Sequence, residues 1–124
     1  QGVFAVSKLG GVAVKLSNDA PGALLADGAN VYWVDAGLVK AQSRFGGLAR
    51  VLYDTRSYGV VEADDTSNLY VQVDQQLVRV SKSGLGASVV WSGDFAPNAA
   101  TTDASAVYFD GGYPTGAIYR LPKR

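Results

Sequence analysis

Three aspartates recur at an even spacing, and they are the side chains best placed to act together chemically. Asp27, Asp65 and Asp103 lie 38 residues apart. One hypothesis is that they form a ring of carboxylates. The alternative is structural, because an Asp side chain accepts hydrogen bonds from nearby backbone N–H groups and so sets a turn. The structural interpretation is favoured, since a residue present in every repeat more often serves the repeat itself.

The densest acidic group consists of Glu62, Asp64, Asp65 and Asp74. Carboxylate oxygens are the ligands that Ca²⁺ prefers, but residues 64–68 lack the spacing of an EF-hand loop. A solvated turn is the favoured interpretation, and we predict no metal site. The absence of His and Cys also argues against a transition-metal centre.

Catalysis has little support in the sequence. Without His or Cys, the usual acyl-transfer triads are absent. A hydrolase with paired carboxylates needs two Asp or Glu at a defined separation, and the eleven acidic residues offer no specific pair. We therefore expect a non-catalytic protein without a cofactor.

Four aromatic residues interrupt the repeat pattern and are the candidate binding residues. Tyr53, Tyr58, Phe95 and Tyr113 fall in predicted loops, and Tyr113 belongs to an insertion at residues 111–116. Exposed aromatic rings on loops above a rigid scaffold are common in binding sites. The structural alternative is that these rings cover the edges of sheets.

Two further groups of residues are predicted to serve the fold. Trp91 aligns with large apolar residues of the other repeats, which favours a role in the core. Lys40, Arg79 and Arg120 align on the third strand of each repeat, so we expect them on a solvated face that discourages edge-to-edge sheet pairing.

The elements that position these residues are short strands in a repeating unit. Tyr32, Tyr70 and Tyr108 share the 38-residue spacing, which indicates an array of one supersecondary unit. Short apolar runs alternate with turn-forming residues, and no stretch has a helical period. We predict an all-β fold of four-stranded antiparallel blades in a single partial β-propeller over residues 1–124. Its predicted parts are a two-stranded segment 2–16, two blades 23–52 and 60–91, and a three-stranded segment 99–121.

The best copy of the unit also resembles a known group of repeats. Residues 25–35, Leu-Ala-Asp-Gly-Ala-Asn-Val-Tyr-Trp-Val-Asp, are similar to the Tyr-Trp propeller repeats of bacterial secreted and surface proteins, and more distantly to YWTD repeats. The other two copies carry Val71 and Phe109 at the position of Trp33. The resemblance implies a six-bladed ring that binds other proteins, and an extracellular or periplasmic location.

The composition limits the partners. Apolar residues make up 48% of the chain and charged residues 18%, which is typical of a globular protein. Eleven basic residues balance eleven acidic ones, so no electrostatic footprint for nucleic acid or a membrane surface is present. No apolar run has the length needed to cross a bilayer.

About three blades are too few to close a propeller ring, which needs about four to eight. Because the chain does not begin with Met, we expect a processed chain or a piece of a longer array. If copies assemble, a homodimer would supply about six blades. The favoured function is a non-catalytic scaffold or binding module for a protein or a glycan. The alternatives are a hydrolase or lyase site on the central channel of the assembled ring, and a fragment without a function of its own.

Overall fold

The computed structural model describes residues 1–112 and 116–123, and all of the regular structure in them is β-strand. The strands are β1 (Val3–Ala5), β2 (Val14–Ser17), β3 (Leu24–Ala26), β4 (Asn30–Asp35), β5 (Leu38–Ser43), β6 (Arg50–Asp54), β7 (Gly59–Asp64), β8 (Asn68–Val73), β9 (Gln76–Ser81), β10 (Ala87–Ser92), β11 (Asn98–Thr102), β12 (Ala106–Asp110) and β13 (Ile118–Pro122).

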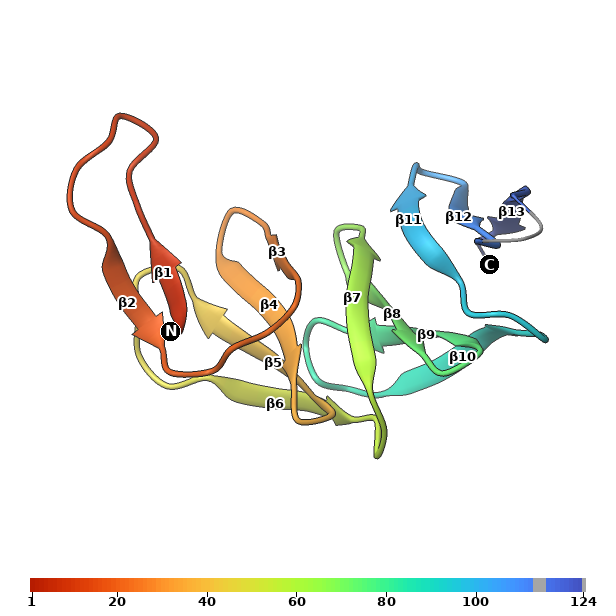
Figure 1. Ribbon diagram of the computed structural model, residues 1–124, viewed down its shortest axis with the longest axis horizontal. Coiled ribbons are helices and arrows are strands. Elements are labelled where there is room, and N and C mark those ends of the chain that lie inside the picture. The colour runs from red at the N-terminus through yellow and green to blue at the C-terminus, as the bar shows by residue number, and fades with distance from the viewer. Residues whose placement is uncertain (113–115, 124) are drawn as a thin grey trace.

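These strands form four separate antiparallel sheets, each in chain order (Figure 1). They are the N-terminal hairpin (β1–β2), the first sheet (β3–β6), the second sheet (β7–β10) and the third sheet (β11–β13). The predicted all-β class and the predicted four-stranded antiparallel unit are confirmed. The described part of the chain contains no closed ring, so the propeller arrangement remains a proposal.

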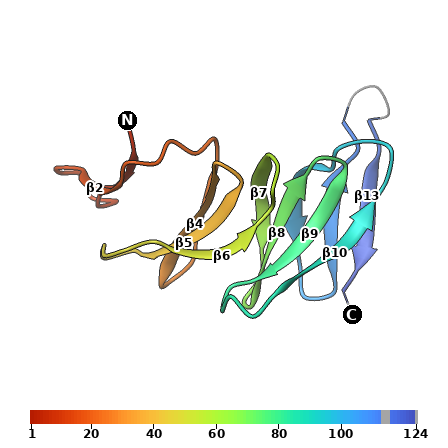
Figure 2. The same cartoon turned by 90° about the horizontal axis from the view of Figure 1, so that it is seen from below.

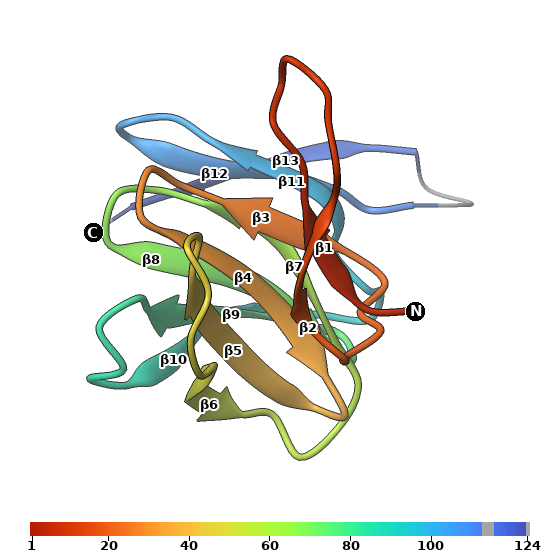
Figure 3. The same ribbon diagram turned by 90° about the vertical axis from the view of Figure 1, so that its left-hand side faces the viewer.

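The sheets follow one another in a row from the hairpin to β13. Figure 3 looks along the long axis and shows them face to face, with the hairpin nearest the viewer. Figure 2 shows the same order from below. Strand β7 contacts β3 and β4 on one side and β11 on the other, so the first strands of successive sheets lie close together. The second sheet is therefore covered on both faces.

This double coverage explains the sequence of β8. Leu69 and Val71 face the first sheet, whereas Tyr70 faces the third, and all three are at most 2% exposed. A strand buried on both faces reads as a continuous apolar run instead of an alternating one.

Two apolar clusters hold the three larger sheets together. The first lies between the first and second sheets and includes Tyr32, Val39, Leu69 and Val80. The second lies between the second and third sheets and is rich in aromatic rings. In it, Phe109 stacks on Tyr119 with ring centroids 5.5 Å apart. The other members that pack around this pair include Trp91, Phe95, Tyr70, Leu77 and Val107.

The turn between β4 and β5 shows why this sequence pattern is required. Ala36 and Gly37 both have positive φ, 50° and 80°, as a two-residue hairpin of the right twist demands. A Cβ on Gly37 would lie 2.6 Å from the carbonyl oxygen of Ser57. Only glycine fits this position, because the link to the second sheet passes directly over it.

Two sequence-based placements are wrong. Tyr53 lies inside β6 and not in a loop, because a bulge in the β5–β6 pairing extends that strand to Asp54. Lys40 does not align with Arg79 and Arg120. It pairs with Trp33 across the sheet, whereas Arg79 and Arg120 pair with Tyr70 and Tyr108. A shift of one residue moves a side chain to the other face of a strand.

Replacement of Leu69 by Ala should lower the free energy of unfolding by about 2 to 5 kcal/mol, because Leu69 is completely buried between two sheets. Urea denaturation measures the change. The control is Leu85→Ala, at a turn residue that is 89% exposed, which should stay within about 0.5 kcal/mol of the wild type. Equal losses in the two variants would contradict the packing described here.

Candidate functional site

The repeated aspartates all occupy the turn between the first and second strands of a sheet. In the first sheet, Oδ1 of Asp27 accepts the backbone N–H groups of Ala29 and Asn30, both at 2.8 Å. The same pair of hydrogen bonds is made to Asp65 by Ser67 and Asn68, and to Asp103 by Ser105 and Ala106. One carboxylate oxygen in each repeat is thus used to set the turn.

The second carboxylate oxygen binds the repeated tyrosine. The hydroxyl groups of Tyr32, Tyr70 and Tyr108 donate to Oδ2 of the aspartate five residues earlier, at 2.7, 2.9 and 2.9 Å. Each tyrosine lies in the second strand of its sheet, directly after the turn. The three Asp–Tyr pairs therefore have the same geometry, and they lie in three different sheets.

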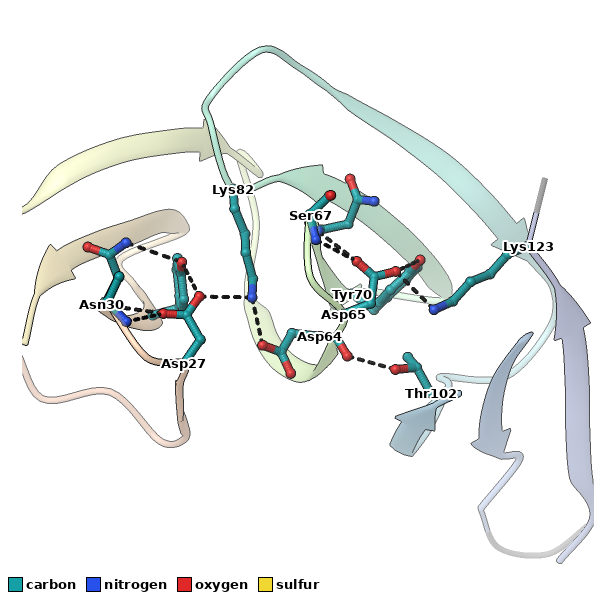
Figure 4. A network of polar contacts seen from close by, with 12 residues as sticks. Asp27, Asn30, Asp64, Asp65, Ser67, Tyr70, Lys82, Thr102 and Lys123 are labelled. Atoms are coloured by element: carbon teal, nitrogen blue, oxygen red, sulfur yellow. Dashed lines mark hydrogen bonds and ion pairs between the residues drawn. The ribbon is translucent and has the colours of Figure 1, made fainter. Parts of the chain in front are cut away.

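A lysine of the following sheet reaches the first of these pairs. Lys82 comes directly after β9, and its Nζ atom lies 3.0 Å from Oδ2 of Asp27 and 2.8 Å from Oδ2 of Asp64 (Figure 4). The residue is only 8% exposed, and the ammonium lies 5.0 Å from the ring centroid of Tyr32. One buried cation thus connects the second sheet to the first.

Lys123 makes the equivalent link from the third sheet to the second. It comes directly after β13, and its Nζ atom lies 2.9 Å from Oδ2 of Asp65 and 5.7 Å from the centroid of the Tyr70 ring. A hydrogen bond of 2.7 Å from Thr102 to the carbonyl oxygen of Asp64 adds to this contact (Figure 4). The two interfaces between sheets therefore use one design.

Glu62 provides a further connection, on the first strand of the second sheet. It lies in β7, and its carboxylate accepts the backbone N–H groups of Ala100 and Ala99 in β11. Burial raises the pKa of Glu62, and these two hydrogen bonds oppose the increase. The Glu62 carboxylate is thus occupied by the neighbouring sheet.

Hydrogen bonding outweighs burial at the repeated aspartates. Burial raises the pKa of Asp65, but Lys123, two backbone N–H groups and Tyr70 lower it from 3.8 to about 2. Burial also raises the pKa of Asp27, yet the same kinds of partner hold it well below its usual value. Burial and the Asp65 carboxylate together raise the pKa of Tyr70 to about 12. The two aspartates therefore stay charged and Tyr70 stays neutral across the neutral pH range, so none of them exchanges protons there.

The predicted binding aromatics do not form a single cluster. Tyr53 packs against the first apolar cluster and Phe95 against the second. Tyr58 is 90% exposed in the link before β7. Tyr113 lies outside the described residues. Of the three described residues, Tyr58 is thus the one that presents its ring to solvent.

A second set of exposed apolar residues was missed by the sequence reasoning. They lie in the turns between the last two strands of the hairpin and of the first two sheets, and we call them the apolar turn tips. Each of the three turn segments includes a Ser-Lys or Ser-Arg pair followed by two glycines. An alignment of this short pattern would have found the apolar residues. The turn tips are Leu9, Val12, Phe45, Leu48 and Leu85, which are 85% to 99% exposed.

The apolar turn tips lie at the same end of the sheets as the Asp–Tyr pairs. Consecutive strands are antiparallel, so the first and third turns of a sheet share one end. Lys82, next to the second sheet's tip Leu85, reaches Asp27 and thereby ties this end of the molecule together. The candidate site is therefore the face of the molecule formed by this end of the three larger sheets. Charged groups are fixed inside this face, and apolar side chains are exposed on it.

The described residues contain no group of three or more acidic, His or Cys side chains placed to hold a metal ion. They also contain no helix long and apolar enough to cross a membrane. Comparisons of the chain with protein-family models, with curated proteins and with solved structures gave no match.

Replacement of Lys82 by Met should lower the free energy of unfolding by about 1 to 2 kcal/mol, because two carboxylates lose a charged hydrogen-bond partner. Lys8→Met is the matched control. Lys8 occupies the corresponding turn position, is exposed and forms no ion pair with a described residue, so its replacement should change stability by less than about 0.5 kcal/mol. An unchanged stability of Lys82→Met would contradict the link between the sheets.

The stability should also depend on the charge of Asp65. Its pKa in the folded protein is depressed, so its contribution is complete above about pH 4 and is lost as the pH falls through about 2. In Asp65→Asn, the loss of unfolding free energy between pH 5 and pH 2 should be smaller than in the wild type by about 2 kcal/mol. Urea denaturation at both pH values measures this difference, and identical acid sensitivity would refute it.

Proposed function

We propose that this chain is a non-catalytic β-propeller scaffold and binding module, whose blades are the sheets and whose ring is completed by self-assembly. The observation that carries the proposal is the repeated contact between sheets. Lys82 reaches the Asp27–Tyr32 pair of the sheet before it, and Lys123 reaches the Asp65–Tyr70 pair in the same manner. A contact that repeats between successive units builds an array that can continue beyond three sheets.

The shape of the units also favours a propeller. Propeller blades are four-stranded antiparallel sheets that converge on a central axis. Here the first strands β3, β7 and β11 run close together. Ala63 and Ala100, which lie on two of these strands, are small enough for such a crowded place.

A scaffold explains the acidic residues better than a catalyst does. Each repeated aspartate uses one oxygen for the turn and the other for the tyrosine. Of the two carboxylates on β7, Glu62 is bound by two backbone N–H groups and Asp64 by Lys82. A glycosidase-type site instead needs two carboxyl groups directed at the substrate.

The apolar turn tips supply the surface for binding. Phe45 is 85% exposed and lies against Arg44, with the guanidinium 4.9 Å from the ring centroid. Leu48 and Leu85 are 96% and 89% exposed. Apolar and Arg side chains presented together are typical of protein interfaces. We therefore propose a protein partner, recognised through an apolar segment.

The test compares the wild type with Leu48→Ser/Leu85→Ser against a displayed peptide library and a glycan panel. We expect peptide binding that the double variant weakens at least tenfold. The matched control is Ile118→Ser, which removes an exposed apolar side chain at the opposite end of the third sheet and should leave binding unchanged. Binding of a glycan only, binding unaffected by the double variant, or no binding by the wild type would each overturn the assignment of this face.

A further inference from the structure

Two charged residues, in the first and third sheets, occupy positions equivalent to those of the Lys–Asp link. Neither has a partner of opposite charge among the described residues. Asp103 has the turn hydrogen bonds and the Tyr108 hydroxyl, as Asp27 and Asp65 do. It makes no ion pair with a basic side chain of residues 1–112 or 116–123. The third sheet is the last sheet among the described residues, and no lysine of a following sheet reaches Asp103 there.

Arg44 is the complementary case in the first sheet. It comes directly after β5, as Lys82 comes directly after β9. Within the described part of the chain it pairs with no carboxylate, and its closest polar contact is the carbonyl oxygen of Gly28 at 3.4 Å. By the pattern of Lys82 and Lys123, its partner should be the repeated aspartate of a preceding sheet.

The place of that preceding sheet is only half filled. The N-terminal hairpin and the segment after it already bind the first sheet. Asp19 accepts hydrogen bonds from Trp33 and Lys40, and the carbonyl oxygen of Leu16 accepts one from Gln42. The hairpin supplies two strands where the first and second sheets have four.

A cleft of about 1080 Å³ lies beside these two strands, between the hairpin and the first sheet. Arg44 and Phe45 line it on one side, and Val12 and Val14 line it on the other. Val12 and Val14 are 88% and 61% exposed. Exposed valines next to an unpaired guanidinium suit a β-sheet that carries an acidic turn.

We propose that the third sheet of a second copy of this chain occupies this cleft, with its Asp103 bound to Arg44. The proposal rests on the propeller function proposed above and names the partner that completes the ring. With two copies, the same contact forms twice around a two-fold axis, so every repeated aspartate has a basic partner from the next sheet. The contact satisfies both unpaired charges at once.

The strand edges fit the same arrangement. The third sheet ends at β13, which lacks the fourth strand that follows in the other two larger sheets. In the hairpin, β2 holds the corresponding last position. The ring of Tyr119 stacks on Phe109 and keeps β13 in its sheet. In the proposed dimer, β2 of one copy therefore separates from its own β1 and pairs with the free edge of β13 of the other copy. Exchange of an identical element between copies is an economical route to a dimer.

The first experiment measures mass by light scattering across a concentration series. The wild type should form a discrete particle of two chains. Arg44→Glu should raise the dissociation constant of that dimer at least tenfold, because Asp103 then faces a like charge. Arg56→Glu, an exposed residue at the opposite end of the sheets, makes the same charge change and should leave the dimer intact. A wild type that is monomeric at all concentrations, or an unaltered dimer in Arg44→Glu, would overturn the proposal.

Cross-linking tests the geometry without relying on the loss of a charge. The chain contains no cysteine, so Arg44→Cys combined with Ala104→Cys introduces the only thiols. Mild oxidation should give a covalently closed dimer that carries two disulfides. The control pair, Arg56→Cys with Ala104→Cys, should remain uncross-linked between copies. An open ladder of multimers, or the absence of intermolecular disulfides, would exclude the closed contact.

The outcome can be separated from that of the proposed function. Arg44→Glu retains Leu48 and Leu85, which do not line the cleft, so its peptide binding can be assayed beside its mass. A monomeric wild type with binding that depends on the turn tips would refute the dimer and support the binding module. A dimer without peptide binding would support the dimer and refute the binding module.

Discussion

The structure depends on a buried ammonium group held between two sheets. Lys82 is almost completely removed from solvent, and its charge is satisfied by carboxylates of both the sheet before it and its own sheet. A buried charge is tolerated only when it is paired and hydrogen-bonded. The burial of Lys82 therefore requires that Asp27 and Asp64 lie within reach of one atom, which fixes how the first and second sheets face each other at this end.

The apolar clusters supply most of the stabilisation between sheets, and the polar links fix how each sheet is oriented against the next. Burial of apolar area stabilises the stack but is not directional. The Asp–Tyr–Lys contact is directional, because the lysine always comes from the sheet that follows. In the described residues this leaves the repeated Asp103 of the third sheet without a basic partner from a following sheet.

Much of the local structure could be predicted from the sequence, since it depends on residues close together in the chain. The turn at Asp27 involves neighbours two and three residues away, and Tyr32 lies five residues away. The partner of Lys82 could not be predicted in this way, because Asp27 lies 55 residues earlier, in another sheet. Tyr53 was misplaced because a bulge in the β5–β6 pairing extends the strand, and a bulge leaves no clear mark in a short apolar run. Lys40 was misaligned by one residue, since it lies opposite Trp33 whereas Arg79 and Arg120 lie opposite the repeated tyrosines.

A double-mutant cycle measures whether Lys82 and Asp27 couple neighbouring sheets. Urea denaturation of the wild type, Lys82→Met, Asp27→Asn and the double variant yields the coupling free energy of the pair. Asn retains an oxygen for the turn at residue 27, so the cycle isolates the contact between sheets. We expect a favourable coupling of about 1 kcal/mol or more. Strictly additive losses would contradict it, because the two residues would then act independently.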